Sequence, residues 1–359
     1  MIRLLVVDDS ALMRKLLGEI FGREADFELA FARNGLEALD LAQSFRPDVV
    51  TLDINMPQMD GLECLDRLMV ERPCPIVMLS SQTAEGAEAT LQALRLGAVD
   101  FLPKPAGAVS LGLHEMAPQL VAKVRAAAGA RLPAALRLRE RVRHRAGHPA
   151  TSRRGRSART PRPVAADGEG VVLVGTSTGG PSALEALLAP LPANFPWPIV
   201  VAQHMPATFT GALARRLDGL CALTVQEVVE PTLLRPGMVL IGRGGGDVIV
   251  SRRTAGLVAL AAPAERHYPW HPSADRLVRS AMDHLPPERL VGVLMTGMGD
   301  DGAAAMTALR AEGGRTIAEA EETAVVWGMP GELVRAGGAT VVAPLSAIAA
   351  RLQEFLPCR

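Results

Sequence analysis

The sequence lacks the features that mark secreted, membrane-spanning or nucleic-acid-binding proteins. Its four cysteines include no Cys-x-x-Cys pair, which disfavours a disulfide framework or a zinc ribbon. No segment reaches the roughly 18 consecutive apolar residues of a membrane-spanning helix. The 38 basic residues balance the 38 acidic ones, so no bulk field attracts nucleic acid. Only three lysines occur, Lys15, Lys104 and Lys123, so arginine supplies most of the positive charge and each lysine is a candidate for a specific role.

The length and the first residues indicate the number of domains and the cellular location. A chain of 359 residues with 48% hydrophobic residues is typical of two ordinary globular domains. It begins MIRLLVVDDS, which puts Asp8 and Asp9 where a secretory signal would need its apolar run. We therefore expect a cytoplasmic protein without direct membrane insertion.

The first 128 residues alternate short apolar runs with amphipathic segments. The runs at 4–7, 27–31, 49–52, 76–80 and 99–102 predict strands, and helical spacing of apolar residues between and after them predicts helices, the last over 115–128. Strands that alternate with helices form a parallel sheet with helices on both faces. The fold predicted for residues 1–128 is a flavodoxin-like domain with a five-stranded parallel sheet.

The pattern breaks after residue 128 and resumes near 170. Residues 130–168 hold eleven arginines and almost no periodic apolar residues, so 129–168 is predicted to be a flexible linker. A solvated tether and a docking strip for an acidic partner or nucleic acid both fit it. From 169 to 359 strands and helices alternate again, which predicts a second, doubly wound Rossmann-like α/β domain with a β-rich stretch between 224 and 260.

Acidic side chains end two strands of the first predicted sheet. Asp8 and Asp9 follow the first strand, and Asp53 follows the third. The carboxyl ends of parallel strands meet at one edge, where ligands bind. Clustered carboxylates repel one another, and Mg²⁺, which prefers oxygen ligands such as these and the Asn55 carbonyl, relieves the repulsion. An Asp-Asp pair alone is more often a turn or a helix cap, so the interpretation depends on the whole set.

The remaining members of that set are Ser80 at the end of the fourth strand and Lys104 after the fifth. Together the motifs VVDDS, DINMPQMDGL, MLSS and FLPKP make residues 1–105 similar to response-regulator receiver domains. The resemblance implies phosphorylation of Asp53 by a histidine kinase of the CheA type. It also implies the roles of the other residues: Asp8, Asp9, Asp53 and the Asn55 carbonyl as Mg²⁺ ligands, Ser80 as switch hydroxyl, Phe101 as switch aromatic, and Lys104 as the phosphoryl contact.

A glycine-rich turn follows the first strand of the second domain. The strand at 171–174 runs into Gly-Thr-Ser-Thr-Gly-Gly, and Pro181 suits the first position of a helix. This places Ser177 on a turn beside helix N–H groups that stabilise negative charge. A phosphate-binding turn of a dinucleotide fold is the alternative, although a serine replaces its middle glycine and no ribose-binding acid follows.

A histidine and an aspartate follow two further apolar strands. His204 comes after 198–202, and Asp301 comes after 290–295. Parallel strands would bring both to the edge that holds Ser177, as a Ser–His–Asp triad requires. Backbone N–H groups of Thr178, Gly179 and Met298 are candidates for binding an oxyanion. Either residue alone has an ordinary explanation, because a lone His after a strand is usually a polar loop residue and Asp-Asp-Gly is often a helix cap.

The second domain resembles the catalytic domain of the CheB family. The motifs are VGTSTGG, QHMPATFTGALARRL, HPSAD, MTGMGDDG and VWGMP. The resemblance implies Ser177, His204 and Asp301 as catalytic residues, with no metal or cofactor in the hydrolytic chemistry. His271 is a second candidate histidine, and Pro269 between it and His267 argues against a helical metal pair. One departure is the loop at 242–247, GRGGGD, where the family commonly has an APG-type turn, and we expect it to affect receptor preference.

The two resemblances together imply a phosphorylation-activated serine hydrolase. It would demethylate glutamate methyl esters on methyl-accepting chemoreceptors, releasing methanol, and deamidate selected glutamines, with the unphosphorylated first domain shielding the cleft. Three rival classes are a non-enzymatic phospho-switch, a DNA-binding regulator that uses the arginine-rich linker, and a dinucleotide enzyme. No helix-turn-helix follows the first domain and the linker has no interleaved aromatics, so we expect no nucleic-acid partner.

Overall fold

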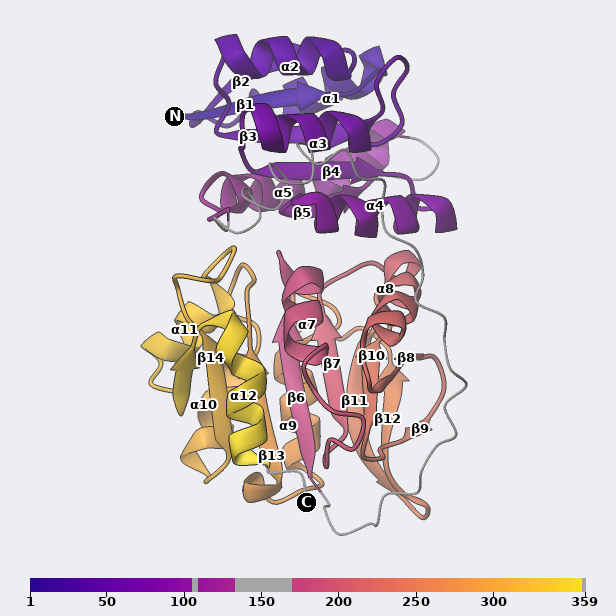
Figure 1. Cartoon of the computed structure of the whole chain (residues 1–359), viewed down its shortest axis with the longest axis vertical. Coiled ribbons are helices and arrows are strands. Elements are labelled where there is room, and N and C mark those ends of the chain that lie inside the picture. Colours follow the sequence, from indigo (N-terminus) through magenta and orange to yellow (C-terminus); the bar gives the residue numbers. More distant parts are fainter. Residues whose placement is uncertain (105–108, 133–169, 357–359) are drawn as a thin grey trace.

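The computed structural model describes residues 1–104, 109–132 and 170–356. It consists of two α/β domains stacked end to end, with the N-terminal domain above the C-terminal one in Figure 1. The predicted linker therefore lies outside the described residues, apart from its first four positions.

The N-terminal domain is a five-stranded, wholly parallel sheet with the strand order β2-β1-β3-β4-β5. Its strands are β1 (Ile2–Val7), β2 (Phe27–Ala32), β3 (Val49–Asp53), β4 (Ile76–Ser80) and β5 (Asp100–Pro103). Its helices are α1 (Ala11–Phe21), α2 (Gly35–Ser44), α3 (Gly61–Glu71), α4 (Ala84–Leu96) and α5 (Val109–Ala128).

Local sequence signals fix where these elements begin. Ser10, Asn34, Asp60 and Thr83 each accept a hydrogen bond at the start of a helix from a backbone N–H three residues on. Such caps satisfy one of the N–H groups that a helix leaves free. Strands β3 and β4 are buried along their whole length, as strands covered by helices on both faces must be.

The C-terminal domain contains a seven-stranded parallel sheet with the order β15-β14-β13-β6-β7-β10-β8, and β11, β12 and β9 form a separate antiparallel sheet. The strands are β6 (Val171–Thr176), β7 (Ile199–Gln203), β8 (Thr224–Val228), β9 (Thr232–Leu233), β10 (Met238–Gly242), β11 (Asp247–Arg253), β12 (Gly256–Ala262), β13 (Leu290–Leu294), β14 (Arg315–Glu319) and β15 (Val341–Ala343). The helices are α7 (Gly180–Leu188), α8 (Ala207–Leu220), α9 (Ala274–Met282), the short 3₁₀ helix η1 (Pro287–Arg289), α10 (Ala303–Ala311), α11 (Met329–Arg335) and α12 (Leu345–Phe355).

The predicted fold class is confirmed in both domains. The sequence pattern missed three short elements, β9, η1 and α11. None of them is long enough to show a period. The β-rich stretch also divides in a way the pattern did not predict, because β8 and β10 join the parallel sheet whereas β9, β11 and β12 do not.

The two domains meet through α4 and β5 on one side and α7 and α8 on the other. The rings of Phe101 and Phe209 pack across the junction with centroids 4.5 Å apart. The Thr178 hydroxyl donates a hydrogen bond of 2.5 Å to Asp100. Arg131, just after α5, pairs with Glu321 at 2.7 Å. The C-terminal ends of β6 and β7 therefore lie against the N-terminal domain.

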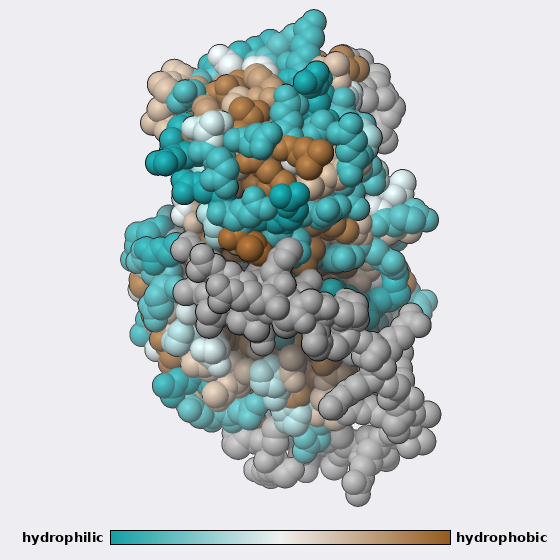
Figure 2. Space-filling model, turned by 45° about the horizontal axis from the view of Figure 1, so that its top comes forward, coloured by the Kyte–Doolittle hydropathy of each residue, from teal (hydrophilic) through white to brown (hydrophobic). Residues whose placement is uncertain are grey.

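The surface in Figure 2 is mixed, with hydrophobic patches interrupting a mainly hydrophilic N-terminal domain. Leu12, Phe31 and Leu36 are among the exposed large hydrophobic residues of this domain. Within the described residues, no helix has the length and apolar character needed to cross a bilayer.

Candidate functional site

Both parallel sheets place polar side chains where the strand order reverses. In the N-terminal domain β1 lies between β2 and β3, and in the C-terminal domain β6 lies between β7 and β13. Ligands of open α/β sheets bind in the crevice that forms at such a point. The predicted residues follow these strands in both domains, so each domain has one candidate site.

The N-terminal site is a cluster of three carboxylates beside one lysine. Ligand oxygens of Asp8, Asp9 and Asp53 lie within 4.8 Å of one another. Lys104, which directly follows β5, reaches into the cluster with its Nζ 2.9 Å from Asp8 and 2.8 Å from Asp53. The donor set fits a hard divalent cation such as Mg²⁺, because all three ligands are carboxylate oxygens.

Asp53 is nearly inaccessible, and its surroundings change its titration. Burial raises the pKa of its carboxyl group, and the neighbouring Asp8 raises it further. Lys104 and a hydrogen bond from the Asn55 backbone N–H oppose this rise without cancelling it. Separately, three carboxylates face a single lysine, so their formal negative charge exceeds what Lys104 alone compensates.

The two predicted switch residues lie on neighbouring strands. Ser80 is fully buried, its hydroxyl donates to the Gly86 carbonyl at 3.1 Å and it accepts from Thr90 at 2.7 Å. Phe101 is 3% exposed because it packs on Phe209 of the other domain. Within the described residues neither side chain forms a hydrogen bond with the carboxylates, and Phe101 instead packs against the C-terminal domain.

Ser177 lies one residue beyond β6, on a turn that the glycines make possible. Gly179 has a φ of +78°, a left-handed conformation that favours glycine. A Cβ atom at Gly180 would lie 1.9 Å from the side-chain oxygen of Gln203, so no larger residue fits there. Gln203 also donates to the Ser177 carbonyl at 2.9 Å, which holds this turn against the end of β7.

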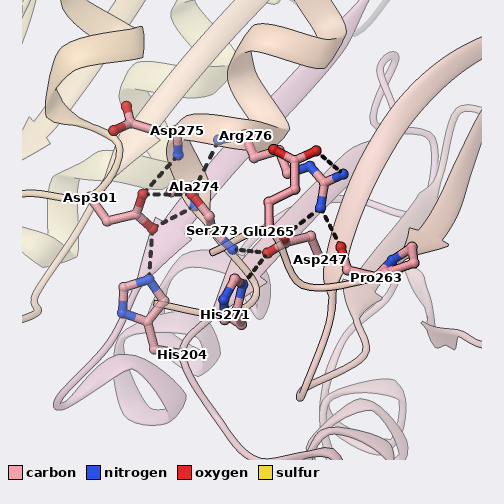
Figure 3. Close-up of polar contacts among 10 residues, drawn as sticks. All are labelled: His204, Asp247, Pro263, Glu265, His271, Ser273, Ala274, Asp275, Arg276 and Asp301. Atoms are coloured by element: carbon pink, nitrogen blue, oxygen red, sulfur yellow. Dashed lines mark hydrogen bonds and ion pairs between the residues drawn. The ribbon is translucent and has the colours of Figure 1, made fainter. Parts of the chain in front are cut away.

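His204 follows β7 at the same level as Ser177. The strands pair Thr176 with Gln203, so the next residues on each are Ser177 and His204. The Nε2 atom of His204 lies 2.8 Å from Asp301 (Figure 3). Its Nδ1 atom is buried without a hydrogen-bond partner among the described residues, and the Ser177 hydroxyl forms no hydrogen bond within that part of the chain.

Asp301 is held by the start of helix α9 as well as by His204. It accepts hydrogen bonds from the Ala274 and Asp275 backbone N–H groups at 2.6 and 3.0 Å and from the Ser273 hydroxyl at 2.8 Å. Burial alone would raise its pKa, but the bond and charge of His204 and these backbone donors outweigh burial, so the pKa is lowered. A carboxylate at a helix N-terminus is stabilised in this way.

Two of the predicted oxyanion groups, Thr178 and Gly179, belong to the same turn, and Met298 lies in the loop after β13. Among the described residues, the backbone N–H groups of Thr178, Gly179 and Met298 form no hydrogen bonds, so they remain available as donors. The loop after β13 is fastened to the turn, because Ser177 donates its N–H to the Thr296 carbonyl at 3.0 Å. Glu319, a residue that the sequence analysis missed, accepts the Thr296 N–H at 2.8 Å. A polar residue at the end of apolar strand β14 was the signal for it.

A cavity of about 230 Å³ opens at the junction of the two domains. Ser177, His204 and His271 line it from the C-terminal domain, whereas Phe101 and Lys123 line it from the N-terminal domain. The Trp270 ring stacks on His204 at a centroid distance of 5.7 Å. The N-terminal domain therefore covers the cavity that contains Ser177.

His271 does not pair with Asp301. Its Nδ1 lies 2.9 Å from Asp247, a carboxylate with no exposed surface at the start of β11. Asp247 ends the loop at 242–247 that departs from the family pattern, and Gly245 of this loop also lines the cavity. No sequence pattern pairs His271 with Asp247, because the antiparallel sheet that supplies Asp247 leaves no strand-end signal.

Comparison with known proteins gives the family. Residues 172–352 match the model of the CheB methylesterase family, and residues 4–113 match that of the response regulator receiver domain. A protein-glutamate methylesterase/protein-glutamine glutaminase 2 of Rhodopseudomonas palustris is 59% identical, covering 99% of this chain and 98% of that protein. A relative of the same activity name in Rhodospirillum rubrum is 52% identical over 99% of this chain and 96% of its own length.

One solved structure agrees with these matches in the C-terminal domain. The CheB methylesterase catalytic domain of Thermotoga maritima superposes with a TM-score of 0.50 and 35% identity, covering 52% of this chain and 98% of that one. The fold and the matches define a response regulator joined to a hydrolase domain. The chain belongs to the CheB methylesterase family, so it is a methylesterase that carries a receiver domain.

Proposed function

We propose that this chain is a phosphorylation-activated serine hydrolase that demethylates glutamate methyl esters on chemoreceptors and deamidates selected receptor glutamines. The observation that carries the catalytic part is the His204–Asp301 pair at 2.8 Å beside Ser177. The names of the relatives support both activities.

The polar contacts assign a role to each group. Ionised Asp301 accepts from Nε2–H of His204, which leaves the lone pair on Nδ1 to take the proton of the Ser177 hydroxyl. The serine oxygen then bonds to the ester carbonyl carbon, and the backbone N–H groups of Thr178, Gly179 and Met298 stabilise the oxyanion. His204 returns the proton to the leaving methoxy group, which departs as methanol, and water hydrolyses the acyl-enzyme by the reverse roles.

The regulatory part follows from strand β5. Lys104 follows this strand and pairs with Asp53, whereas Asp100 and Phe101 on the same strand contact Thr178 and Phe209 of the catalytic domain. Asp8, Asp9, Asp53 and the Asn55 carbonyl would hold Mg²⁺, which supplies positive charge beside the phosphoacceptor. A phosphoryl group on Asp53 redirects Lys104 and shifts β5, which weakens the cover over the cavity.

The partners follow from the same chemistry. Only a phosphodonor that reaches the carboxyl edge of the receiver sheet can modify Asp53, and a histidine kinase of the CheA type fits this role. The substrate is a cytoplasmic segment of a methyl-accepting chemoreceptor. We place the enzyme in the cytoplasm for that reason, with residues 129–168 as the tether between its domains.

The test measures methanol release from a methylated receptor fragment by the full chain, with and without acetyl phosphate as phosphodonor. Ser177→Ala should lower the rate by at least about 10³-fold, because removing a serine nucleophile leaves only binding and oxyanion stabilisation. The phosphodonor should raise the wild-type rate and leave the rate of Asp53→Asn unchanged. Substantial turnover by Ser177→Ala would disprove the nucleophile, and equal stimulation of Asp53→Asn would disprove the phosphoacceptor.

A further inference from the structure

A second histidine–aspartate pair lies beside the catalytic one. Asp247 has no exposed surface, and it accepts three hydrogen bonds: from Ser273 N–H at 2.7 Å, from Arg276 at 2.6 Å and from His271 Nδ1 at 2.9 Å. The guanidinium of Arg276 compensates the Asp247 charge. An ionised carboxylate can only accept, so the proton at this contact belongs to Nδ1 of His271.

This arrangement fixes what the other ring nitrogen can do. With the proton on Nδ1, the neutral His271 ring has a lone pair on Nε2 and can accept one hydrogen bond there. Within the described residues, Nε2 of His271 forms no hydrogen bond. The ring lines the cavity that also contains Ser177 and His204. His271 therefore brings an acceptor that has no donor among the described residues to the cavity that contains Ser177.

Both histidines are held by the same short segment. Ser273 donates its backbone N–H to Asp247 and its hydroxyl to Asp301, and the two carboxylates are thereby joined through one residue (Figure 3). His204 and His271 consequently keep a fixed relation to each other. A ring held so firmly loses little conformational freedom when it binds a ligand.

The two substrates of the enzyme differ in the group that such an acceptor recognises. A glutamyl methyl ester presents a methoxy oxygen, which has no N–H or O–H, whereas a glutamine presents an NH₂ group with two donors. We infer that His271, oriented by Asp247, is a specificity-determining residue that accepts a hydrogen bond from the side-chain NH₂ of a glutamine substrate. This inference rests on the proposed roles of Ser177 and His204.

His271 transfers no proton in this scheme. The Ser177 oxygen bonds to the amide carbon, its proton passes to His204, and the C–N bond breaks as His204 gives that proton to the nitrogen, which leaves as ammonia. The hydrogen bond to His271 holds one N–H away from His204, so that the nitrogen lone pair faces the proton donor. Ester cleavage needs no such orientation, because the methoxy oxygen has two lone pairs.

The experiment uses the full chain and two forms of one receptor fragment, with glutamine or glutamate methyl ester at the same position. In His271→Asn the amide N–H can still donate to Asp247, but nothing replaces the Nε2 acceptor. We expect kcat/KM for ammonia release to fall about tenfold, as one lost hydrogen bond of about 1.4 kcal/mol implies. Methanol release should stay within about twofold of the wild-type value.

Further variants separate this role from a structural one. His271→Gln, whose amide oxygen can reach the former position of Nε2, should recover part of the glutaminase activity. His271→Phe keeps a ring without an acceptor and repeats the test if the asparagine variant does not fold. His267→Asn is the matched control, because His267 is an exposed histidine four residues away.

The outcomes are distinct. An equal fall in ammonia and methanol release would make His271 a structural residue. An unchanged kcat/KM for ammonia release in both His271→Asn and His271→Phe would also overturn the inference. Failure of the catalytic assignment gives another result, because Ser177→Ala would then retain both activities.

Discussion

The two sheet edges of this molecule treat buried carboxylates in opposite ways. At the receiver edge three carboxylates converge within 4.8 Å with Lys104 among them, and the pKa of Asp53 is raised, chiefly by burial. At the hydrolase edge Asp301 accepts hydrogen bonds from His204, Ser273 and the start of α9, and its pKa is lowered in spite of burial. One topology thus yields an edge where carboxylates crowd around one lysine, and another that keeps an anion beside an imidazole.

The largest effect should come from removing the Asp301 carboxylate at the hydrolase edge. Asp301→Asn removes the ionised acceptor of His204 Nε2–H and lets the ring take the wrong tautomer. We expect methanol release to fall by about 10³–10⁴-fold, as removal of the orienting aspartate does in other triads. The measurement is steady-state methanol release by folded protein, and Asp300→Asn, at an exposed neighbouring position, should retain most of the activity. A loss of less than tenfold in Asp301→Asn would contradict the proposed role.

An intermediate effect concerns Glu319, the third carboxyl group near the hydrolase edge. Burial raises its pKa from 4.5 to about 7, although Thr296 and Thr323 donate hydrogen bonds to it. Unlike Asp53 it has no lysine beside it. A folded-state pKa above the unfolded one means that its stabilising contribution is present below pH 4.5 and is lost as the pH rises through about 7. This loss amounts to about 3 kcal/mol at about 1.4 kcal/mol per pKa unit.

Glu319→Gln tests this effect, because the amide can accept from Thr296 N–H and donate to Thr323. The measurement is urea denaturation of variant and wild type at about pH 5 and about pH 8. The free energy of unfolding of the variant minus that of wild type should be larger at about pH 8 than at about pH 5, by up to about 3 kcal/mol. Glu322→Gln, at an exposed position, is the matched control and should track the wild type. A constant difference between Glu319→Gln and wild type at the two pH values would show that Glu319 is not protonated in this range.

The smallest effect concerns an ion pair between the two domains. Arg131→Ala removes an exposed ion pair with Glu321, in which the side chains are 57% and 51% exposed. Such pairs contribute about 0.2–1 kcal/mol, so methanol release without a phosphodonor should rise about twofold. Raising the salt concentration should also increase methanol release by wild type, because salt screens the ion pair, and should leave the rate of the variant unchanged. Arg67→Ala breaks a salt bridge inside α3 and should leave the rate unchanged. An equal rise in that variant would contradict a role for the Arg131–Glu321 pair in holding the N-terminal domain over the cavity.

Most of the polar site residues near the ends of apolar strands were predictable from the sequence, although Glu319 was missed. Asp8, Ser177 and His204 directly follow strands, Asp53 ends β3, and Asp301 lies in the loop after β13. The alternation of strands and helices implied that parallel strands bring these residues to common edges.

The remainder depended on contacts that no local pattern encodes. Asp247 begins a strand of a separate antiparallel sheet, so its meeting with His271 and Arg276 arises from packing of distant segments. The bond from Thr178 to Asp100 depends on how two finished domains fit together. Short elements such as α11 escape prediction because seven residues hold less than two turns of helical period.

Strand β5 has a consequence for how this enzyme can evolve. Lys104 directly follows this four-residue strand and pairs with Asp53, the proposed phosphoacceptor, and Asp100 at its other end accepts a hydrogen bond from Thr178 of the hydrolase turn. At about 3.3 Å per residue the whole span is about 13 Å. Under the proposed regulation a substitution there is pleiotropic, because it alters how the signal is received and how tightly the resting enzyme is silenced. Signal sensitivity and leakiness should therefore drift together among descendants, unless a compensating change arises on α8.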